Sequence, residues 1–123
     1  MRRVIIEAPY AGDVDENVAY GRRAMRDALQ RGEAPILSHL LYAQPSVLND
    51  AIPDEQELET DAGDAWLGVA EACVVYADLG ISDRMWRGIE AAREAGVAVE
   101  FRKLGRLTIR LLRLAESPAD RRA

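Results

Sequence analysis

The segment from Val74 to Leu104, VVYADLGISDRMWRGIEAAREAGVAVEFRKL, constrains the fold more than any other part of the chain. It continues an almost unbroken apolar run, Ala72 to Asp78, which is typical of a central strand in a parallel sheet that is buried on both faces. Apolar residues at helical spacing then lead to Gly96, and an alternating strand follows from Val97 to Leu104. Strand, helix and strand in this order predict a βαβ unit.

The N-terminal part of the sequence has the same alternation. Val4 to Ile6 form a β-branched apolar run, which predicts a buried strand that is closed by a loop containing Gly12. A helical period follows as far as Gly32, and either Asp13 or Asp15 can cap the start of that helix. We therefore expect a second strand–loop–helix unit that feeds the same sheet.

The remaining segments are less regular. We expect a second strand over Ala34 to His39, a long acidic loop with a helical turn near Leu40 to Tyr42, and a helix over Asp64 to Ala72. The segment Leu107 to Leu114 suits a strand or a helix, with the helix favoured. The chain is thus predicted to be an α/β protein, a flavodoxin/Rossmann-like three-layer sandwich around a parallel sheet of four or five strands. Residues 1–115 are expected to form a single domain, and residues 116–123 a flexible tail.

Composition excludes several classes of function. The formal net charge is -5, and phosphate backbones are bound by clustered Lys and Arg, so we expect no polynucleotide partner. No apolar run is long enough to span a bilayer, and we expect no membrane partner. Cys73 is the single cysteine and lies in an apolar run, which favours a reduced, cytoplasmic protein.

Ligands of such sheets bind at the carboxyl ends of the strands, where three loops are expected to meet. The candidates for substrate binding are Tyr10, Gly12, Asp13, His39 and Ser82, and the candidates for catalysis are Asp78, Glu90 and Asp64. Tyr10 could stack on a base or sugar, and Ser82 at a helix start could bind phosphate. Each has a structural alternative: Asp78 and Ser82 could cap turns or helices, and Glu90 could lie on a solvated helix face.

The sequence contains no motif for a metal site or a dinucleotide-binding site. One histidine and one cysteine in different segments make no set of metal ligands. The loop APYAGD is neither a GxGxxG fingerprint nor a P-loop. We therefore expect no cofactor and no metal ion.

Several segments together resemble the nucleoside 2-deoxyribosyltransferase-like superfamily, and more closely a small, largely uncharacterised branch common in phage and actinobacterial genomes. The resemblance lies in IIEAPYAGD, GEAPILSHLLY and VVYADLGIS, followed by GIEAAREAGVAVEFRKL. The segment DAWLGVAEACVVYADLGIS is also similar to the nucleotide N-glycosidases of that superfamily. The resemblance covers almost the whole chain to Leu104.

The resemblance implies a five-stranded flavodoxin-like sheet, a homo-oligomer with active sites near subunit contacts, and chemistry at an N-glycosidic bond. It also implies a catalytic Glu four residues after a small residue in a turn, but those two positions are Gly88 and Arg84 here, and Glu90 comes two residues later. The function we predict is hydrolysis or deoxyribosyl transfer on a small nucleoside or nucleotide. The alternative is a noncatalytic nucleotide-binding or sensing domain, and a third reading is a structural or interaction module.

Overall fold

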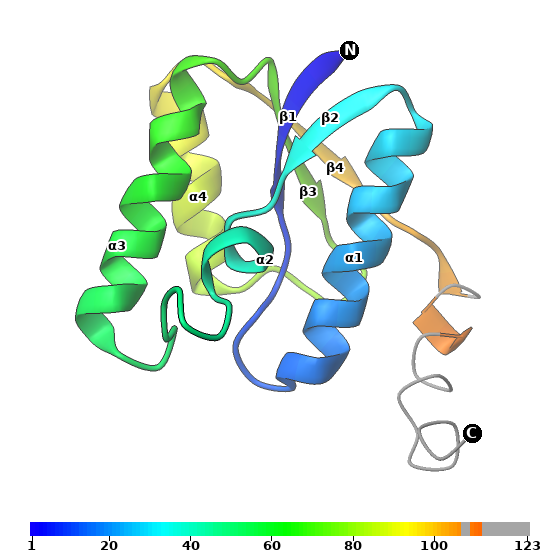
Figure 1. Cartoon of the computed structure of the whole chain (residues 1–123). Coiled ribbons are helices and arrows are strands. Elements are labelled where there is room, and N and C mark those ends of the chain that lie inside the picture. Colours follow the sequence, from blue (N-terminus) through cyan, green and yellow to red (C-terminus); the bar gives the residue numbers. More distant parts are fainter. Residues whose placement is uncertain (107–108, 112–123) are drawn as a thin grey trace.

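The computed structural model describes residues 1–106 and 109–111 (Figure 1). The elements in chain order are β1 (Arg2–Glu7), α1 (Val14–Gln30), β2 (Glu33–Ile36), α2 (Ser38–Tyr42), α3 (Pro53–Asp64), the 3-10 turn η1 (Ala65–Gly68), β3 (Ala72–Tyr76), α4 (Asp83–Glu94) and β4 (Ala98–Arg102). Arg106 and residues 109–111 are helical, while residues 107–108, 112–114 and the expected tail lie outside the described residues.

The four strands form one parallel sheet in the order β2-β1-β3-β4. Helix α1 covers one face of the sheet, and α3 and α4 lie on the other (Figure 1). The predicted α/β, flavodoxin-like sandwich is therefore confirmed, with four strands. The chain leaves β1 towards one edge of the sheet and returns through β3 to the other side, so the order of connection reverses between β1 and β3. Sheets of this kind bind ligands at that reversal.

Alternating side chains of the strands divide the core in two. Val4 and Ile6 of β1 pack towards α1, together with Tyr20 and Ala24 of that helix. Ile89 and its apolar neighbours on α4 pack against the opposite face of β3. Because β3 is fully buried along its length, both faces of the sheet exclude water, as the apolar sequence of this strand predicts.

Two predicted helix starts are confirmed by their caps. The carboxylate of Asp13 accepts a hydrogen bond from the backbone N–H of Glu16 at 3.1 Å, and Asp13 rather than Asp15 is the cap of α1. The hydroxyl of Ser82 accepts one from the N–H of Met85 at 3.2 Å, which caps α4. Each bond satisfies a backbone donor that a helix start leaves without a partner.

The middle of the chain differs from the prediction. The second strand ends at Ile36, and His39 lies in the short helix α2 instead. The expected long loop contains the helix α3, which starts with Pro53 at a first-turn position that Pro favours. The helix predicted over residues 64–72 is only the turn η1. Among the described residues, no helix is long and apolar enough to cross a membrane.

The acidic composition of α3 explains why its sequence looked like a loop. Its buried side chain is Glu59, which is 1% exposed and ion-paired with Arg84 of α4. A helix whose buried contact is a carboxylate has no apolar period to detect. The inner side of α3 is therefore held by Arg84, a residue of α4 that is distant in the sequence.

Candidate functional site

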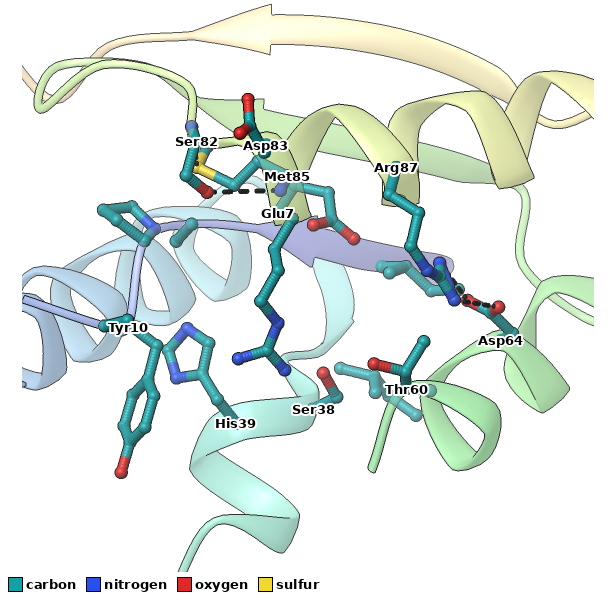
Figure 2. A pocket seen from close by; sticks show the side chains of 18 of the residues that line it. Glu7, Tyr10, Ser38, His39, Thr60, Asp64, Ser82, Asp83, Met85 and Arg87 are labelled. Atoms are coloured by element: carbon teal, nitrogen blue, oxygen red, sulfur yellow. Dashed lines mark hydrogen bonds and ion pairs between the residues drawn. The ribbon is translucent and has the colours of Figure 1, made fainter. Parts of the chain in front are cut away.

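A cavity of about 290 Å³ lies at the carboxyl edge of the sheet, where the connection order reverses (Figure 2). Its wall comes from the end of β1 and the loop after it, from α2, from the last turns of α3 and from the first turns of α4. The polar or charged residues that line it are Glu7, Tyr10, Ser38, His39, Thr60, Asp64, Ser82, Asp83, Arg84 and Arg87. Four segments that are distant in sequence thus meet at one site.

The carboxyl group of Glu7, a half-buried residue, lines this cavity. Glu7 is the last residue of β1 and pairs with Val75 of β3, and it lines the cavity together with Ile5, two residues before it. Within the described residues, neither a hydrogen bond nor an ion pair joins this carboxyl group to another side chain. Burial raises the pKa of Glu7 to about 8, and the charge of Asp64 adds to this while Arg87 opposes it. At neutral pH the group is therefore mostly a neutral acid.

Gly88 of α4 provides the space for that carboxyl group. A Cβ atom at position 88 would come closer to all three atoms of the Glu7 carboxyl group than the 3.0 Å that real Cβ contacts respect. Glycine inside a helix costs roughly 1 kcal/mol relative to alanine. The close approach of β1 to α4 therefore depends on a residue that is otherwise unfavourable in that helix.

Tyr10 and His39 form an aromatic wall on another side of the cavity, with ring centroids 5.0 Å apart (Figure 2). The loop that carries Tyr10 is held by Asn17 of α1, whose side-chain amide donates to the carbonyls of Tyr10 and Ala11 at 2.9 and 3.0 Å. This anchoring fixes the direction in which Tyr10 enters the cavity. A fixed pair of rings suits a planar ligand.

His39 is buried, at 6% exposed; neither ring nitrogen forms a well-aligned hydrogen bond with the described residues, although the backbone of Ala8 lies close enough to act on the ring. Burial lowers the pKa of His39 to about 4, and the nearby positive charge of Arg84 acts in the same direction. The ring is therefore neutral at physiological pH and offers one donor and one acceptor. Because Ala8 can engage only one of the two ring nitrogens, the ring still has hydrogen-bonding capacity to offer a ligand.

The two arginines of the cavity wall are both paired with carboxylates. Arg87 donates to Asp64 of α3 at 2.5 Å, as the dashed lines of Figure 2 show. Arg84 donates to Asp50 at 2.9 Å and also binds Glu59. These ion pairs join α4 to α3 and to the loop before it, so they close one side of the cavity.

The structure brings together four of the candidates, Tyr10, His39, Asp64 and Ser82, in the wall of this cavity. Gly12, Asp13, Asp78 and Glu90 are not among the residues that line it. Gly12 has φ of 99° in the turn that leads into α1, which is a left-handed conformation that glycine adopts without strain. Asp13 caps α1, and Glu90 is exposed on α4.

Asp78 holds the segment that follows β4 in place. Its carboxylate accepts hydrogen bonds from the Tyr20 hydroxyl at 2.6 Å and from the backbone N–H groups of Leu104 and Gly105 at 2.8 and 3.0 Å. Burial alone would raise the pKa of Asp78, but these hydrogen bonds outweigh it and hold the pKa below its usual value. This geometry matches the alternative in which Asp78 stabilises the turn after its strand.

Several residues of the cavity were not among the candidates, and the charged groups of Glu7, Arg84 and Arg87 matter most among them. Glu7 carried a signal, because it alternates with Ile6 and directly precedes the loop after β1, so it had to point towards the face opposite to Ile6. The arginines carried none, because charged positions on a helix are ordinarily solvated. In the described residues, no cluster of His, Cys, Asp and Glu could hold a metal ion.

The fold and this cavity define the chain as a parallel α/β protein of the flavodoxin-like type with a cavity at its topological switch point, the place where such sheets bind ligands. Residues 2–102 match a protein family described as "Domain of unknown function (DUF7768)", and the chain belongs to that family. A search of curated proteins found no match, and a search of solved structures found none either.

Proposed function

We propose that the protein cleaves the N-glycosidic bond of a small nucleoside or nucleotide, by hydrolysis or by deoxyribosyl transfer. The observation that carries the proposal is the carboxyl group of Glu7, which lines a cavity at the switch point of the sheet without a hydrogen bond or ion pair to the described residues. Carboxyl groups are the usual catalysts of glycosidic bond cleavage, because the transition state has oxocarbenium-ion character.

The other walls of the cavity support the same substrate class. A volume of about 290 Å³ is close to the lower end of the range for small-molecule sites, which suits a ligand the size of a nucleoside. Tyr10 and His39 offer a flat aromatic surface for a base, and a ring nitrogen of His39 can bond to its polar edge. Sugar and base would thus meet different sides of one pocket.

The resemblance to the nucleoside 2-deoxyribosyltransferase-like superfamily supports this proposal independently of the cavity. We propose membership of that superfamily as the finer classification, together with a homo-oligomeric assembly. The parallel sheet of order β2-β1-β3-β4 is compatible with both.

The test is release of free base from a panel of nucleosides and nucleoside monophosphates, both ribose and deoxyribose forms, with and without acceptor bases, resolved by chromatography. Release of any base above the uncatalysed rate, or exchange between bases, is the expected result. A panel without release or exchange at millimolar substrate would refute the enzymatic function.

A second candidate is a noncatalytic nucleotide-binding or sensing domain. It is favoured by the absence of a carboxylate at Gly88, the position at which the resemblance places the catalytic Glu, and by the ion pair that holds Arg87 to Asp64. Thermal unfolding with added nucleotides tests it, because a ligand that binds the folded state raises the melting temperature. Stabilisation by a nucleotide that is recovered intact would support this candidate over the enzyme.

A further inference from the structure

The position of Glu7 at the end of β1 directs its carboxyl group into the cavity. Its ladder partner is Val75, and Cys73, Val75 and Met85 surround this face of the sheet with apolar atoms. Glu7 is half-buried, and a carboxyl group that loses part of its hydration usually regains it by pairing with another group. Here the described residues offer Glu7 no such bond, although Arg87 lies in the same cavity wall and pairs with Asp64 instead.

The packing of α4 is adapted to this group. Gly88 faces Glu7 across the gap between α4 and β1, and any side chain at position 88 would occupy the space that the carboxyl group fills. The carboxyl group of β1 therefore sits where a side chain of α4 would otherwise begin. A side chain at position 88 and the Glu7 carboxyl group would therefore compete for the same space in the cavity.

We propose that Glu7 is the catalytic acid of this site and that it protonates the leaving base from β1. This inference rests on the proposed cleavage of an N-glycosidic bond. The proton of the Glu7 carboxyl group passes to a ring nitrogen of the base while the bond between C1′ and the base breaks, and the electron pair of that bond stays with the base. Water then adds to C1′ and its proton returns to the Glu7 carboxylate. In base exchange, the nitrogen of the acceptor base adds to C1′ and gives its proton to Glu7 instead.

Loss of hydration keeps this acid protonated at neutral pH, while the neighbouring positive and negative groups act on its pKa in opposite directions. Arg84 and Arg87 face it from α4, Glu59 and Asp64 from α3, and the Cys73 thiol from β3. Burial dominates and places the pKa of Glu7 at about 8. A general acid works best with a pKa near the working pH, so this environment suits the role.

The first test compares the wild type with Glu7→Gln, which keeps the shape of the side chain and removes the transferable proton. Base release is expected to fall by about 10²- to 10⁴-fold, as is typical for the loss of a general acid. Glu94→Gln is the matched control, because it neutralises an exposed carboxylate at the end of α4. Base release by Glu7→Gln at the rate of the Glu94→Gln control would overturn the proposal.

The pH dependence separates a general acid from a nucleophile. An acid must be protonated, so base release by the wild type is expected to be high below about pH 8 and to fall above it. The residual release by Glu7→Gln should lack this decline. A wild-type rate that rises through this pH range would show that the ionised carboxylate is the active form and would overturn the acid role.

The second test moves the carboxyl group between the two elements. The variant Glu7→Gly/Gly88→Glu places a carboxyl group in the cavity from α4, and its control is Glu7→Gly/Gly88→Gln. We expect the Glu form to release base at least about tenfold faster than the Gln form, since the two differ only in a transferable proton. Equal rates in the two variants would contradict the inference that the location of the carboxyl group decides activity.

The failures of the two proposals are distinguishable. If the folded wild type releases no base from any substrate, the proposed function fails, and this inference fails with it. If the wild type releases base and Glu7→Gln does so equally well, only the role of Glu7 fails. Circular dichroism of each variant establishes that a loss of rate is not a loss of fold.

Discussion

The substitution Arg102→Met is expected to cause a large loss of stability without touching the cavity. Arg102 at the end of β4 donates through both terminal nitrogens to the carboxylate of Glu33 at the start of β2, each at 2.7 Å. The side chains of both residues are only 6% exposed. Arg102 also donates to the hydroxyl of Tyr76 at 3.2 Å. Methionine would remove all three bonds and leave the Glu33 carboxylate buried.

The loss of folding free energy can be estimated in two ways, from the cost of breaking a buried ion pair and from the pKa of Glu33. Removing one partner of a buried ion pair typically costs about 3–5 kcal/mol, and Arg2, which still reaches Glu33 at 2.6 Å, favours the lower end of that range. Hydrogen bonds from Arg102, the largest cause, and from Arg2 lower the pKa of Glu33 from 4.5 to about 2; the whole shift corresponds to about 3 kcal/mol of stability at neutral pH, which is an upper bound for Arg102→Met because Arg2 remains. For a domain of this length we expect the melting temperature to fall by about 10–15 °C.

Urea unfolding followed by circular dichroism measures the effect. Arg23→Met, at an exposed position of α1, is the matched control and should change the free energy of unfolding by less than about 0.5 kcal/mol. The double variant Arg102→Met/Glu33→Met should recover at least half of the loss, because it removes the buried charge as well as its partner. Arg2 would then keep Glu100, which it contacts at 2.7 Å.

The effect has a defined pH window. A carboxyl group whose pKa is lower in the folded state stabilises the fold above its unfolded pKa, and that stability is lost as the pH falls through the folded pKa. The difference between wild type and Arg102→Met should therefore be full above about pH 4.5, shrink below it, and nearly vanish by about pH 2. A difference of less than about 1 kcal/mol at neutral pH, or one that grows in acid, would refute this reasoning.

Three further substitutions or treatments test other parts of the structure. Tyr20→Phe should cost about 1.5–3 kcal/mol in urea unfolding, because it removes the 2.6 Å hydrogen bond to the charged Asp78; an unchanged stability would mean that this bond contributes nothing. Ser82→Ala should cost about 1 kcal/mol by the same assay through the loss of the α4 cap, and Ser82→Thr, which keeps the hydroxyl, should cost less. Burial raises the pKa of Cys73 to about 12, so a thiol reagent at mildly alkaline pH should modify it only as the protein unfolds, and rapid labelling of the native protein would contradict its burial.

The sheet could be predicted because its signals are local. The apolar run of β3 and the apolar period of α4 identify a βαβ unit without any knowledge of tertiary contacts. Asp13 and Ser82 were among the cap candidates for the same reason, since a cap bonds to a backbone group only three residues away. Parallel order and helices on both faces then follow from general rules of chain connection.

The segment between β2 and β3 could not be predicted because its stability comes from distant partners. Helix α3 buries Glu59 against Arg84 of α4, and its end is joined to Arg87 through Asp64. A composition rich in Asp and Glu ordinarily predicts a solvated loop, and nothing within α3 reveals the arginines that neutralise it. His39 was placed in a strand for a related reason: it follows apolar residues closely, and only the packing of α2 against α3 and α1 takes it out of the sheet.

The location of the acidic group follows from how closely β1 and α4 approach each other. The resemblance implies a catalytic Glu at position 88 of α4, which is Gly here, so sequence reasoning offered Asp78, Glu90 and Asp64 as the catalytic candidates instead. In three dimensions position 88 is not empty, because the absence of a side chain there is what admits the carboxyl group of Glu7. The two positions are 81 residues apart in the chain, so no motif of fixed spacing could join them. What defines a site of this kind is where its reactive atoms lie in space. A search for similar sites should therefore compare the groups that line the cavity, whichever element carries them, rather than the residue type at one helix position.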